Sequence, residues 1–172
     1  MGKPPTLSSK EVTYASGALH TALAGLLISI YTLYVEFRAE ADHEYTALCD
    51  ISPSVSCTAA LLSEYSVGFG IIAPLLGEES IFNQKNSLYG VVGYIFLAVI
   101  QLWESRALAT VSLVLAVFLN TMSVYLGAAL FKLRILCPVC CAIYLVNAVF
   151  LYYAYRRSVA ATEIKVYKKK RR

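Results

Sequence analysis

Long uncharged stretches dominate the pattern of hydrophobic and polar positions along the chain. Residues 12–35, 86–103, 107–131 and 135–155 contain no Asp, Glu, Lys or Arg. A bilayer crossing requires about 20 largely apolar residues, so four membrane spans fit, the second being the shortest. The stretches lack the alternation of barrel strands, and backbone groups inside hydrocarbon must bond within the chain. The pattern therefore predicts helices.

The predicted fold is an all-α membrane protein, a four-transmembrane-helix bundle with a luminal loop that forms a cap. The composition agrees, because 58% of the residues are hydrophobic and only 15% are charged. The first span is too long for the core of a cleavable signal peptide and is expected to remain as an anchor. The expected segments are spans at about 13–35, 87–104, 107–131 and 136–156, a luminal loop at 36–86 and a basic cytosolic tail at 157–172.

The distribution of charge predicts the orientation. The net charge of +4 comes mainly from the C-terminal tail, and Lys3 and Lys10 precede the first span. Positive residues favour the cytosol, so both termini are expected there, and nucleic acid is not an expected partner. The loop at 36–86 carries eight acidic and two basic residues and is expected on the non-cytosolic side, in the lumen or outside. Lys132 and Arg134 run against this rule, but four spans place them on the luminal side as well.

All five cysteines fall on that luminal side. Cys49 and Cys57 lie in the acidic loop, and Cys137, Cys140 and Cys141 stand where the fourth span begins. The lumen is the oxidising compartment, where disulfides persist and exchange. Because the orientation came from charge alone, the placement of sulfur supports it independently.

The luminal loop is longer than a structureless connection in a compact protein usually is, so it is expected to fold. The stretch "SPSVSCTAALLSEY" predicts a short helix with Ser52 as its cap and Pro53 in its first turn. The stretch "YSVGFGIIAPLLG" is uncharged but too short to span, which favours an interfacial or re-entrant segment. The alternative is an apolar patch packed on the loop's own small core.

The C-x-x-C motif carries the candidate chemistry. A helix turns about 100° per residue, so Cys137, Cys140, Tyr144 and Asn147 fall within an arc of roughly 80°. Pro138 is tolerated in a first turn and predicts that the helix starts near Cys137. Unpaired amides at a helix N-terminus stabilise a thiolate, the nucleophilic form of cysteine.

Such a pair is a cycling dithiol, a structural disulfide or half of a zinc site. Zinc is disfavoured, because His20 and His43 are the only histidines and no second C-x-x-C exists. Taken alone, Cys49 and Cys57 are typical of a structural disulfide. Together the two pairs suggest a relay, in which loop thiols pass electrons to the membrane pair by disulfide exchange.

Polar groups near the motif suggest the substrate. Asn86 stands at the luminal start of the second span, and Tyr144 lies about one turn below Cys140. Both donate hydrogen bonds to carbonyl oxygens, which suits a lipid-borne quinone in an apolar pocket. Asn86 as a helix cap and Tyr144 in an aromatic belt are the alternatives. For Asn120 and Asn147 we expect hydrogen bonds between helices.

An ordered set of motifs resembles the vitamin K epoxide reductase family in its vertebrate form. The set comprises "ALCD" with Cys49, then Cys57, "GFG" at 68–70, "NQKNS" at 83–87, and "CPVC" followed by Tyr144. The resemblance covers nearly the whole chain, from the first span to the end of the fourth. There are two departures: Pro138 stands where the family has a branched aliphatic residue, and Cys141 adds a neighbouring thiol.

The resemblance implies roles for the cysteines. Cys140 would attack a quinone or its epoxide near the luminal surface or receive its adduct, and Cys137 would resolve the adduct and accept electrons from the loop. Cys49 would attack the Cys137–Cys140 disulfide, and Cys57 would then close on Cys49.

The resemblance also implies the surroundings of the substrate. Asn86 and Tyr144 would hold the substrate oxygens, and Leu61, Ser63, Phe69 and Cys57 would belong to the cap or pocket wall. No cofactor or metal is expected to be bound permanently, since vitamin K quinone and its epoxide are the substrates. Thioredoxin-like luminal or membrane-anchored redox proteins would supply electrons, and 4-hydroxycoumarin anticoagulants would occupy the pocket.

The expected location is the endoplasmic reticulum membrane. Lys169 and Lys170 stand at the spacing of a cytosolic dilysine retrieval signal, although the positive-inside rule alone accounts for them equally well. Two other functions stay open. One is a disulfide-forming oxidase that reduces a ubiquinone-like lipid, and the other is a non-enzymatic tetraspan adaptor with structural disulfides.

Overall fold

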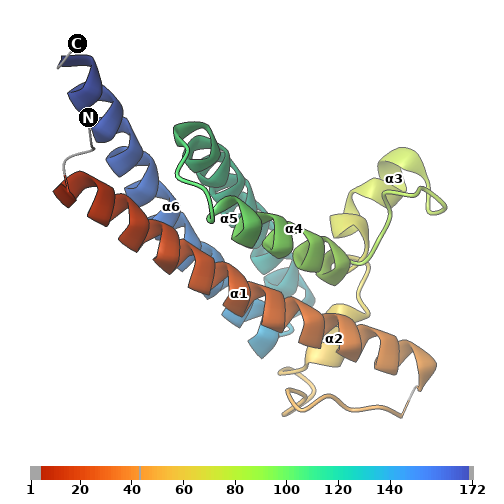
Figure 1. The fold of residues 1–172 in the computed structure, drawn as a ribbon. Coiled ribbons are helices and arrows are strands. Elements are labelled where there is room, and N and C mark those ends of the chain that lie inside the picture. Colours follow the sequence, from red (N-terminus) through yellow and green to blue (C-terminus); the bar gives the residue numbers. More distant parts are fainter. Residues whose placement is uncertain (1–4, 43, 171–172) are drawn as a thin grey trace.

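The chain folds into a bundle of long helices with a small cap at one end (Figure 1). The computed structural model describes residues 5–42 and 44–170, with backbone alone for 5–8, 165 and 167–170. Within these residues there are isolated β-bridges but no strand, so the predicted all-α class is confirmed. The elements are α1 (Pro5–Ala41), α2 (Cys57–Leu61), a 3-10 turn (Gly68–Gly70), α3 (Ile72–Leu76), α4 (Asn86–Ile100), α5 (Arg106–Leu133) and α6 (Pro138–Lys170).

Three segments are long and apolar enough to cross a membrane, namely Ser9–Ala41, Arg106–Leu133 and Pro138–Ile164. The chain is therefore a multi-pass membrane protein. Helix α4 has 15 residues and rises about 22 Å, which is less than the roughly 30 Å of a hydrocarbon core. The four-span arrangement and its boundaries stay a prediction. Lys3, the side chains of Lys169 and Lys170, and the last two residues of the basic tail lie outside what the structure describes.

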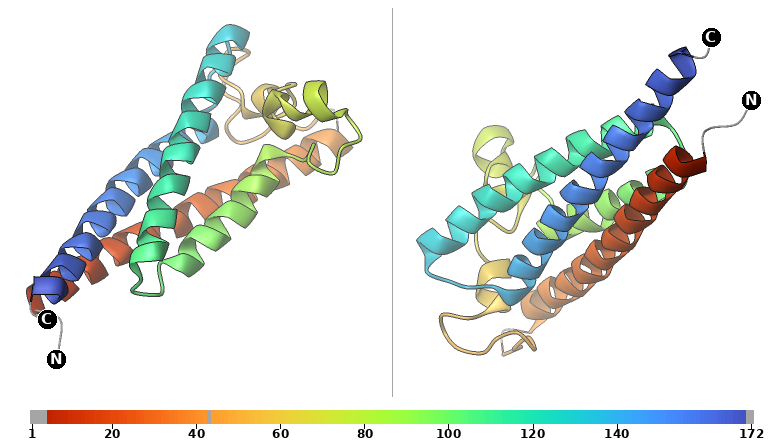
Figure 2. Two further views of the ribbon diagram at one scale, coloured as in Figure 1. Left: turned by 90° about the horizontal axis from the view of Figure 1, so that it is seen from above. Right: turned by 90° about the vertical axis from the view of Figure 1, so that its left-hand side faces the viewer.

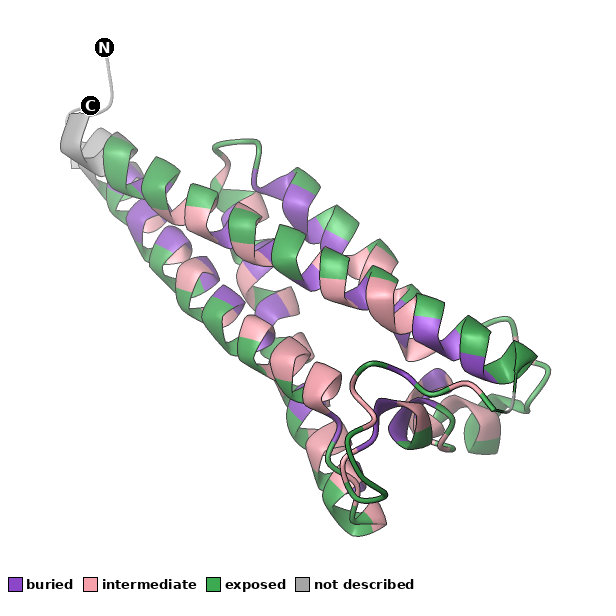
Figure 3. Ribbon diagram, turned by 90° about the horizontal axis from the view of Figure 1, so that it is seen from below, coloured by how far each residue is buried: buried purple, intermediate pink, exposed green. Residues whose placement is uncertain are grey.

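The packing of the helices leaves one pair apart. Helix α1 lies along both α4 and α6, and α5 packs on α6, whereas α4 and α5 have little contact. From the turn that joins them, α4 and α5 diverge toward the cap (Figure 2). Where helices do meet, small residues such as Ala18, Ala22, Ala116 and Ala154 are fully buried and allow close approach. Buried positions face the interior of the bundle, and exposed ones cover its outside (Figure 3).

The two ends of the bundle differ. The beginning of α1 and the end of α6 lie at one end, and α2 and α3 lie at the other (Figure 1). The four cysteines of the two predicted pairs all belong to the second end, which we call the cysteine end. The prediction that loop and membrane cysteines share one side therefore agrees with the arrangement of the helices.

Arg157 is buried, although the sequence suggested that it begins a basic tail. Its side chain has no exposed surface. It donates hydrogen bonds to Gln101 Oε1 at 2.6 Å and to the Trp103 carbonyl at 2.6 Å. Because Gln101 and Trp103 belong to the turn between α4 and α5, the guanidinium ties that turn to α6.

Asn120 and Asn147 join helices, as the sequence predicted. Asn120 donates to the Asn147 carbonyl at 2.9 Å, and Asn147 donates to Ser123 Oγ at 2.8 Å. The Tyr94 hydroxyl donates to Asn147 Oδ1 at 2.6 Å. This network links α4, α5 and α6 in the interior, where an unpaired polar group is costly.

The helix expected in the loop begins later than predicted. It starts at Cys57, and its cap is Ser56, whose Oγ accepts a hydrogen bond from the Ala59 amide at 3.0 Å. The prediction of Ser52 as the cap is wrong. Ser52 and Pro53 form a turn instead, closed by the Val55 amide on the Ser52 carbonyl at 2.9 Å. Residues after this turn stay extended because they pair with another segment, described below.

The segment predicted as interfacial folds as the 3-10 turn followed by α3. Gly68, Phe69 and Gly70 all have positive φ, of 54°, 58° and 68°. Glycine adopts this region freely, but Phe69 does so at a cost. Leu75 and Leu76 on α3 are 74% and 63% exposed, so the interfacial placement of this segment stays a prediction.

Candidate functional site

A cavity of about 560 Å³ opens between the helices beneath the cap. It forms because α4 and α5 do not pack on each other and side chains of α1, α6 and the cap line the space left. Its size and mainly apolar walls are typical of small-molecule sites. All five residues predicted to contact substrate line it: Leu61, Ser63, Phe69, Asn86 and Tyr144.

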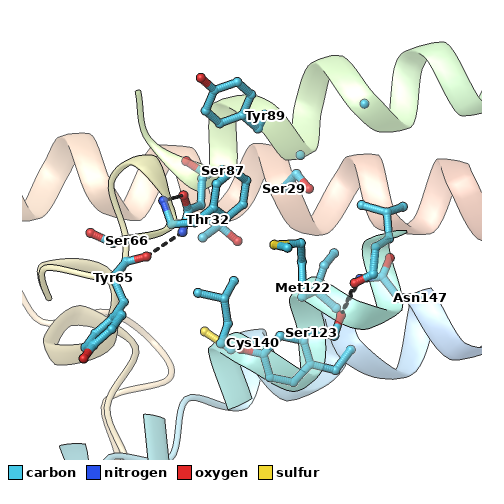
Figure 4. Close-up of a pocket in the computed structure, with 18 of the residues that line it drawn as sticks. Ser29, Thr32, Tyr65, Ser66, Ser87, Tyr89, Met122, Ser123, Cys140 and Asn147 are labelled. Atoms are coloured by element: carbon cyan, nitrogen blue, oxygen red, sulfur yellow. Dashed lines mark hydrogen bonds between the residues drawn. The ribbon is translucent and has the colours of Figure 1, made fainter. Parts of the chain in front are cut away.

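Two disulfides stand at the cysteine end. Cys49 pairs with Cys57 and Cys137 pairs with Cys140, with Cα atoms 5.7 Å and 5.2 Å apart. Cys141 is a free, exposed thiol. All five cysteines are described, and Cys140 alone among them lines the cavity, where Figure 4 shows its sulfur.

The motif sits at the start of α6, as its proline predicted. Pro138 is the first helical residue. The Cys137 carbonyl accepts the first helical hydrogen bond, from the Cys141 amide at 3.0 Å, and its sulfur accepts the Cys140 amide at 3.2 Å. Amides of a first helical turn stabilise negative charge on sulfur, so the fold favours the thiolate form once the disulfide is reduced.

Both disulfides belong to one hydrophobic group, which we call the cysteine cluster. Its buried members are Val35, Ala47, Cys57, Ala60, Leu61 and Cys137, with Cys49 and Cys140 packed against them. Cys57 and Cys137 are completely buried, whereas Cys49 is partly exposed. The two pairs therefore share an apolar environment, and Cys49 is the member of the loop pair nearer to solvent.

A parallel β-bridge between Val55 and Leu136 joins the loop to the residue before the motif. The Ser56 amide donates to the Leu136 carbonyl at 3.0 Å, and the Leu136 amide donates to the Ser54 carbonyl at 2.8 Å. These bonds bring the chain entering Cys57 alongside the chain entering Cys137. They also explain why residues 55 and 56 are extended and α2 starts at Cys57.

Asp50 organises the loop around Cys49 and Cys57. Its Oδ1 accepts from Ser56 Oγ at 2.7 Å and the Thr58 amide at 3.0 Å, and its Oδ2 accepts from the Ala47 amide at 2.7 Å and Thr58 Oγ1 at 2.6 Å. Partial burial opposes ionisation, but these hydrogen bonds outweigh it and lower the pKa of Asp50 to about 2. The ionised carboxylate holds both ends of the disulfide loop.

Asn86 holds the cap over the cavity. Its Oδ1 accepts the Phe69 amide at 2.9 Å, and its Nδ2 donates to the Tyr65 carbonyl at 2.6 Å. It is the first residue of α4, whose cap position is Lys85, so the alternative role as a helix cap is wrong. A carboxamide has two N–H donors, and the second is not used in these bonds.

Phe69 and Tyr144 differ in their contacts with neighbouring residues. The Phe69 ring stacks on Tyr89, with centroids 5.5 Å apart. The hydroxyl of Tyr144 has no hydrogen-bond partner among the described residues, although its side chain lines the cavity. A half-buried phenol without a protein partner is positioned to bind a ligand oxygen.

Sequence reasoning missed polar residues on α1. Ser29, Thr32 and Glu36 line the cavity, and Figure 4 shows the first two with Ser87 of α4. Their spacing of three and four residues is the helical repeat of one face, which was the available signal. Within the described residues, no group of three or more His, Cys, Asp or Glu side chains is arranged to hold a metal ion.

Comparisons with known proteins identify the family of the chain. The model of the Vitamin K epoxide reductase family matches residues 18–155. Vitamin K epoxide reductase complex subunit 1 of Mus musculus is 33% identical over 141 residues, which cover 81% of this chain and 87% of the relative. The Rattus norvegicus protein of the same name shows the same identity and coverage.

Proposed function

The chain belongs to the vitamin K epoxide reductase family, and from this we propose that it reduces vitamin K epoxide and vitamin K quinone with electrons from Cys137 and Cys140. The observation that carries the proposal is the position of Cys140, which lines the cavity with Asn86 and Tyr144. A nucleophile thus faces the same space as two groups able to bind substrate oxygens. The divergence of α4 from α5 leaves that space beside the hydrocarbon, where a lipid-borne quinone resides.

Reduction of the epoxide begins at Cys140. Its thiolate opens the ring, so that a carbon–sulfur bond forms, a carbon–oxygen bond breaks, and the oxygen takes up a proton. The Cys137 thiolate then attacks the Cys140 sulfur and closes the disulfide. The electron pair of the broken carbon–sulfur bond returns to the substrate, which expels the hydroxyl; with a second proton this leaves as water, and the substrate becomes the quinone.

Reduction of the quinone uses the same pair. Addition of Cys140 and resolution by Cys137 leave two electrons on the ring, and uptake of two protons produces the hydroquinone. Asn86 and Tyr144 hold the substrate oxygens, where negative charge develops during both reactions. Hydrogen-bond donors fixed at such positions stabilise the transition state.

The loop pair restores the dithiol, and its arrangement supports an order different from the one expected from the sequence. We assign the attack on Cys137 to Cys57 instead of Cys49, because Cys57 and Cys137 are both fully buried and each follows a residue held by the Val55–Leu136 pairing. A donor thiolate attacks Cys49 and frees Cys57, and Cys57 attacks Cys137 and frees Cys140. The donor's second thiol then releases Cys49, which attacks Cys57 and frees Cys137.

The partners and location follow from this scheme. Thioredoxin-like luminal or membrane-anchored redox proteins supply the electrons, because the partly exposed Cys49 must meet a dithiol. The protein resides in the endoplasmic reticulum membrane with both termini cytosolic and the cysteine end in the oxidising lumen. Inhibitors of the 4-hydroxycoumarin class occupy the cavity, since their oxygens suit the donors that hold a quinone.

The test supplies the purified protein with a small dithiol and vitamin K epoxide. Turnover to the quinone is expected, and Cys140→Ser abolishes it, whereas Cys141→Ser, the matched control one residue away, retains it. Absence of turnover in the unsubstituted protein, with both disulfides resistant to mild reductant, would instead identify a structural adaptor. Turnover with ubiquinone but not with vitamin K would identify the oxidase.

A further inference from the structure

A buried carboxyl group faces the cavity without a role in the scheme above. The side chain of Glu36 has no exposed surface, and it lines the cavity together with Cys140. Ser87 Oγ donates a hydrogen bond to its Oε2. Its Oε1 is buried and has no hydrogen-bond partner among the described residues. A buried polar atom without a hydrogen-bond partner costs free energy. An unpaired carboxyl oxygen on a residue that lines a ligand cavity is therefore a candidate functional group.

We propose that Glu36 is the acid that protonates the substrate oxygen during reduction, an inference that rests on the proposed function. The reduction needs protons as well as electrons, and the thiol pair loses its protons to reach the attacking thiolate form. A neutral carboxyl group bears a hydroxyl hydrogen and donates it to an oxyanion, becoming a carboxylate. Solvent at the cysteine end then returns the proton, so the electrons come from sulfur and Glu36 is neither oxidised nor reduced.

The position of Ser87 supports this assignment. Ser87 directly follows Asn86, the proposed ligand of a substrate oxygen, so Glu36 is held beside the same part of the cavity. The bond from Ser87 occupies Oε2, whereas Oε1 is buried and has no partner among the described residues. A general acid must lie within hydrogen-bond reach of the atom it protonates.

Two charged groups, Glu40 and Lys85, act on Glu36 and do not line the cavity. Glu40 lies one turn further along α1, and Lys85 precedes Asn86; these two side chains form an ion pair with each other. Among the described residues that line the cavity, Glu36 is the one with a carboxyl group.

The experiment compares Glu36→Gln with the unsubstituted protein, using vitamin K quinone and a small dithiol across the pH range in which both stay folded. Glutamine keeps the size of the side chain and an acceptor for Ser87 but releases no proton. We expect kcat to fall about 100-fold, with quinone binding and thermal unfolding unchanged. In the unsubstituted enzyme, kcat falls at alkaline pH as Glu36 ionises, which produces an alkaline limb in the pH profile. Glu36→Gln is expected to lack this alkaline limb.

Two further variants separate an acid from a structural group. Glu36→Asp retains a carboxyl group and therefore the alkaline limb, at a reduced kcat. Glu44→Gln, which removes an acidic group at the same end outside the cavity, leaves kcat and the pH profile unchanged. Unaltered kcat in Glu36→Gln, or a lower kcat with a pH profile parallel to that of the unsubstituted enzyme, overturns the proposal while leaving the proposed function intact. An inactive unsubstituted protein overturns both.

Discussion

The amide of Ser56 donates a hydrogen bond to the carbonyl of Leu136 at 3.0 Å, and each of these residues immediately precedes a cysteine of a different disulfide. Eighty residues of sequence separate the two positions. The bond fixes the loop to the start of α6, where electrons would cross between the pairs in the proposed relay. If the proposed exchange between Cys57 and Cys137 occurs, we expect it to need local movement of side chains without dissociation of the cap.

Cys49→Ser tests which loop cysteine meets the membrane pair. Without its partner, the Cys57 thiol is free within the cluster that contains Cys137, and it is expected to form a disulfide with Cys137. Peptide mapping by mass spectrometry under non-reducing conditions detects the Cys57–Cys137 link. Cys57→Ser is the matched variant, and an abundant Cys49–Cys137 link in it, with none in Cys49→Ser, would restore the order expected from the sequence.

The same substitution separates the relay from the chemistry. Cys49→Ser is expected to lose activity with a thioredoxin-like protein donor, because that donor enters at Cys49. A small membrane-permeant dithiol bypasses Cys49 and reduces the disulfide of Cys137, whether its partner is Cys140 or Cys57, so much of the activity with it remains. Steady-state rates with the two reductants provide the measurement, and equal loss with both contradicts a shuttle.

Asp50→Asn is expected to loosen the loop that carries Cys49. An amide keeps one acceptor oxygen but places an N–H group against donors, and a hydrogen bond to a charged group contributes about 1.5–3 kcal/mol. Hydrogen exchange at the Thr58 amide is therefore expected to accelerate about tenfold or more. Glu44→Gln removes a charge from the same loop and is expected to leave that exchange rate unchanged.

Acid is expected to have the same effect on the unsubstituted protein. The pKa of Asp50 is lowered from 3.8 to about 2 by hydrogen bonds that outweigh its partial burial. A group with a depressed folded-state pKa stabilises the fold fully above its unfolded value, and this stabilisation is lost as the pH falls through about 2. Fluorescence or exchange measurements of loop stability are expected to show this loss, and Asp50→Asn to lack it.

Tyr144→Phe is expected to impair substrate handling without changing stability. The hydroxyl it removes has no protein partner among the described residues, so the apparent melting temperature stays the same. Loss of one hydrogen bond of about 1 kcal/mol predicts a fall of roughly fivefold in kcat/KM. Asn86→Ala provides the contrast, because it also breaks the bonds to Tyr65 and Phe69 and is expected to increase proteolysis of the cap.

Gly93→Leu tests whether the cavity holds the quinone. Gly93 lines the cavity, and a Cβ added there meets nothing within 4 Å, so leucine enters open space. Displacing roughly 50 Å² of apolar ligand contact costs about 1.3 kcal/mol, or about tenfold in affinity. Equilibrium binding measures the loss, and Gly93→Ala is expected to show a much smaller one. Unchanged affinity in Gly93→Leu would place the quinone elsewhere.

The sequence by itself determined the helices and the chemical groups. Uncharged runs predict membrane helices because hydrocarbon admits only a self-bonded backbone, and the C-x-x-C motif with Pro138 predicts a thiol pair at a helix start. Helical spacing placed Tyr144 below Cys140, and both line the cavity. These features depend on residues close together in the chain, so the spacing of hydrophobic and polar residues predicts them directly.

Only the tertiary structure decided how distant segments meet. The sequence placed the loop cap at Ser52, Arg157 in a tail and the attack on Cys137 with Cys49. The bridge to Leu136 places the cap at Ser56, and hydrogen bonds to the α4–α5 turn hold Arg157 in the interior. Which loop cysteine attacks Cys137 stays a proposal, for which the burial of Cys57 beside Cys137 favours Cys57. The hydrogen bond that positions Glu36 likewise comes from Ser87, 51 residues away. Such pairings depend on hydrogen bonds and packing between segments far apart in the chain, which the pattern of one segment does not record.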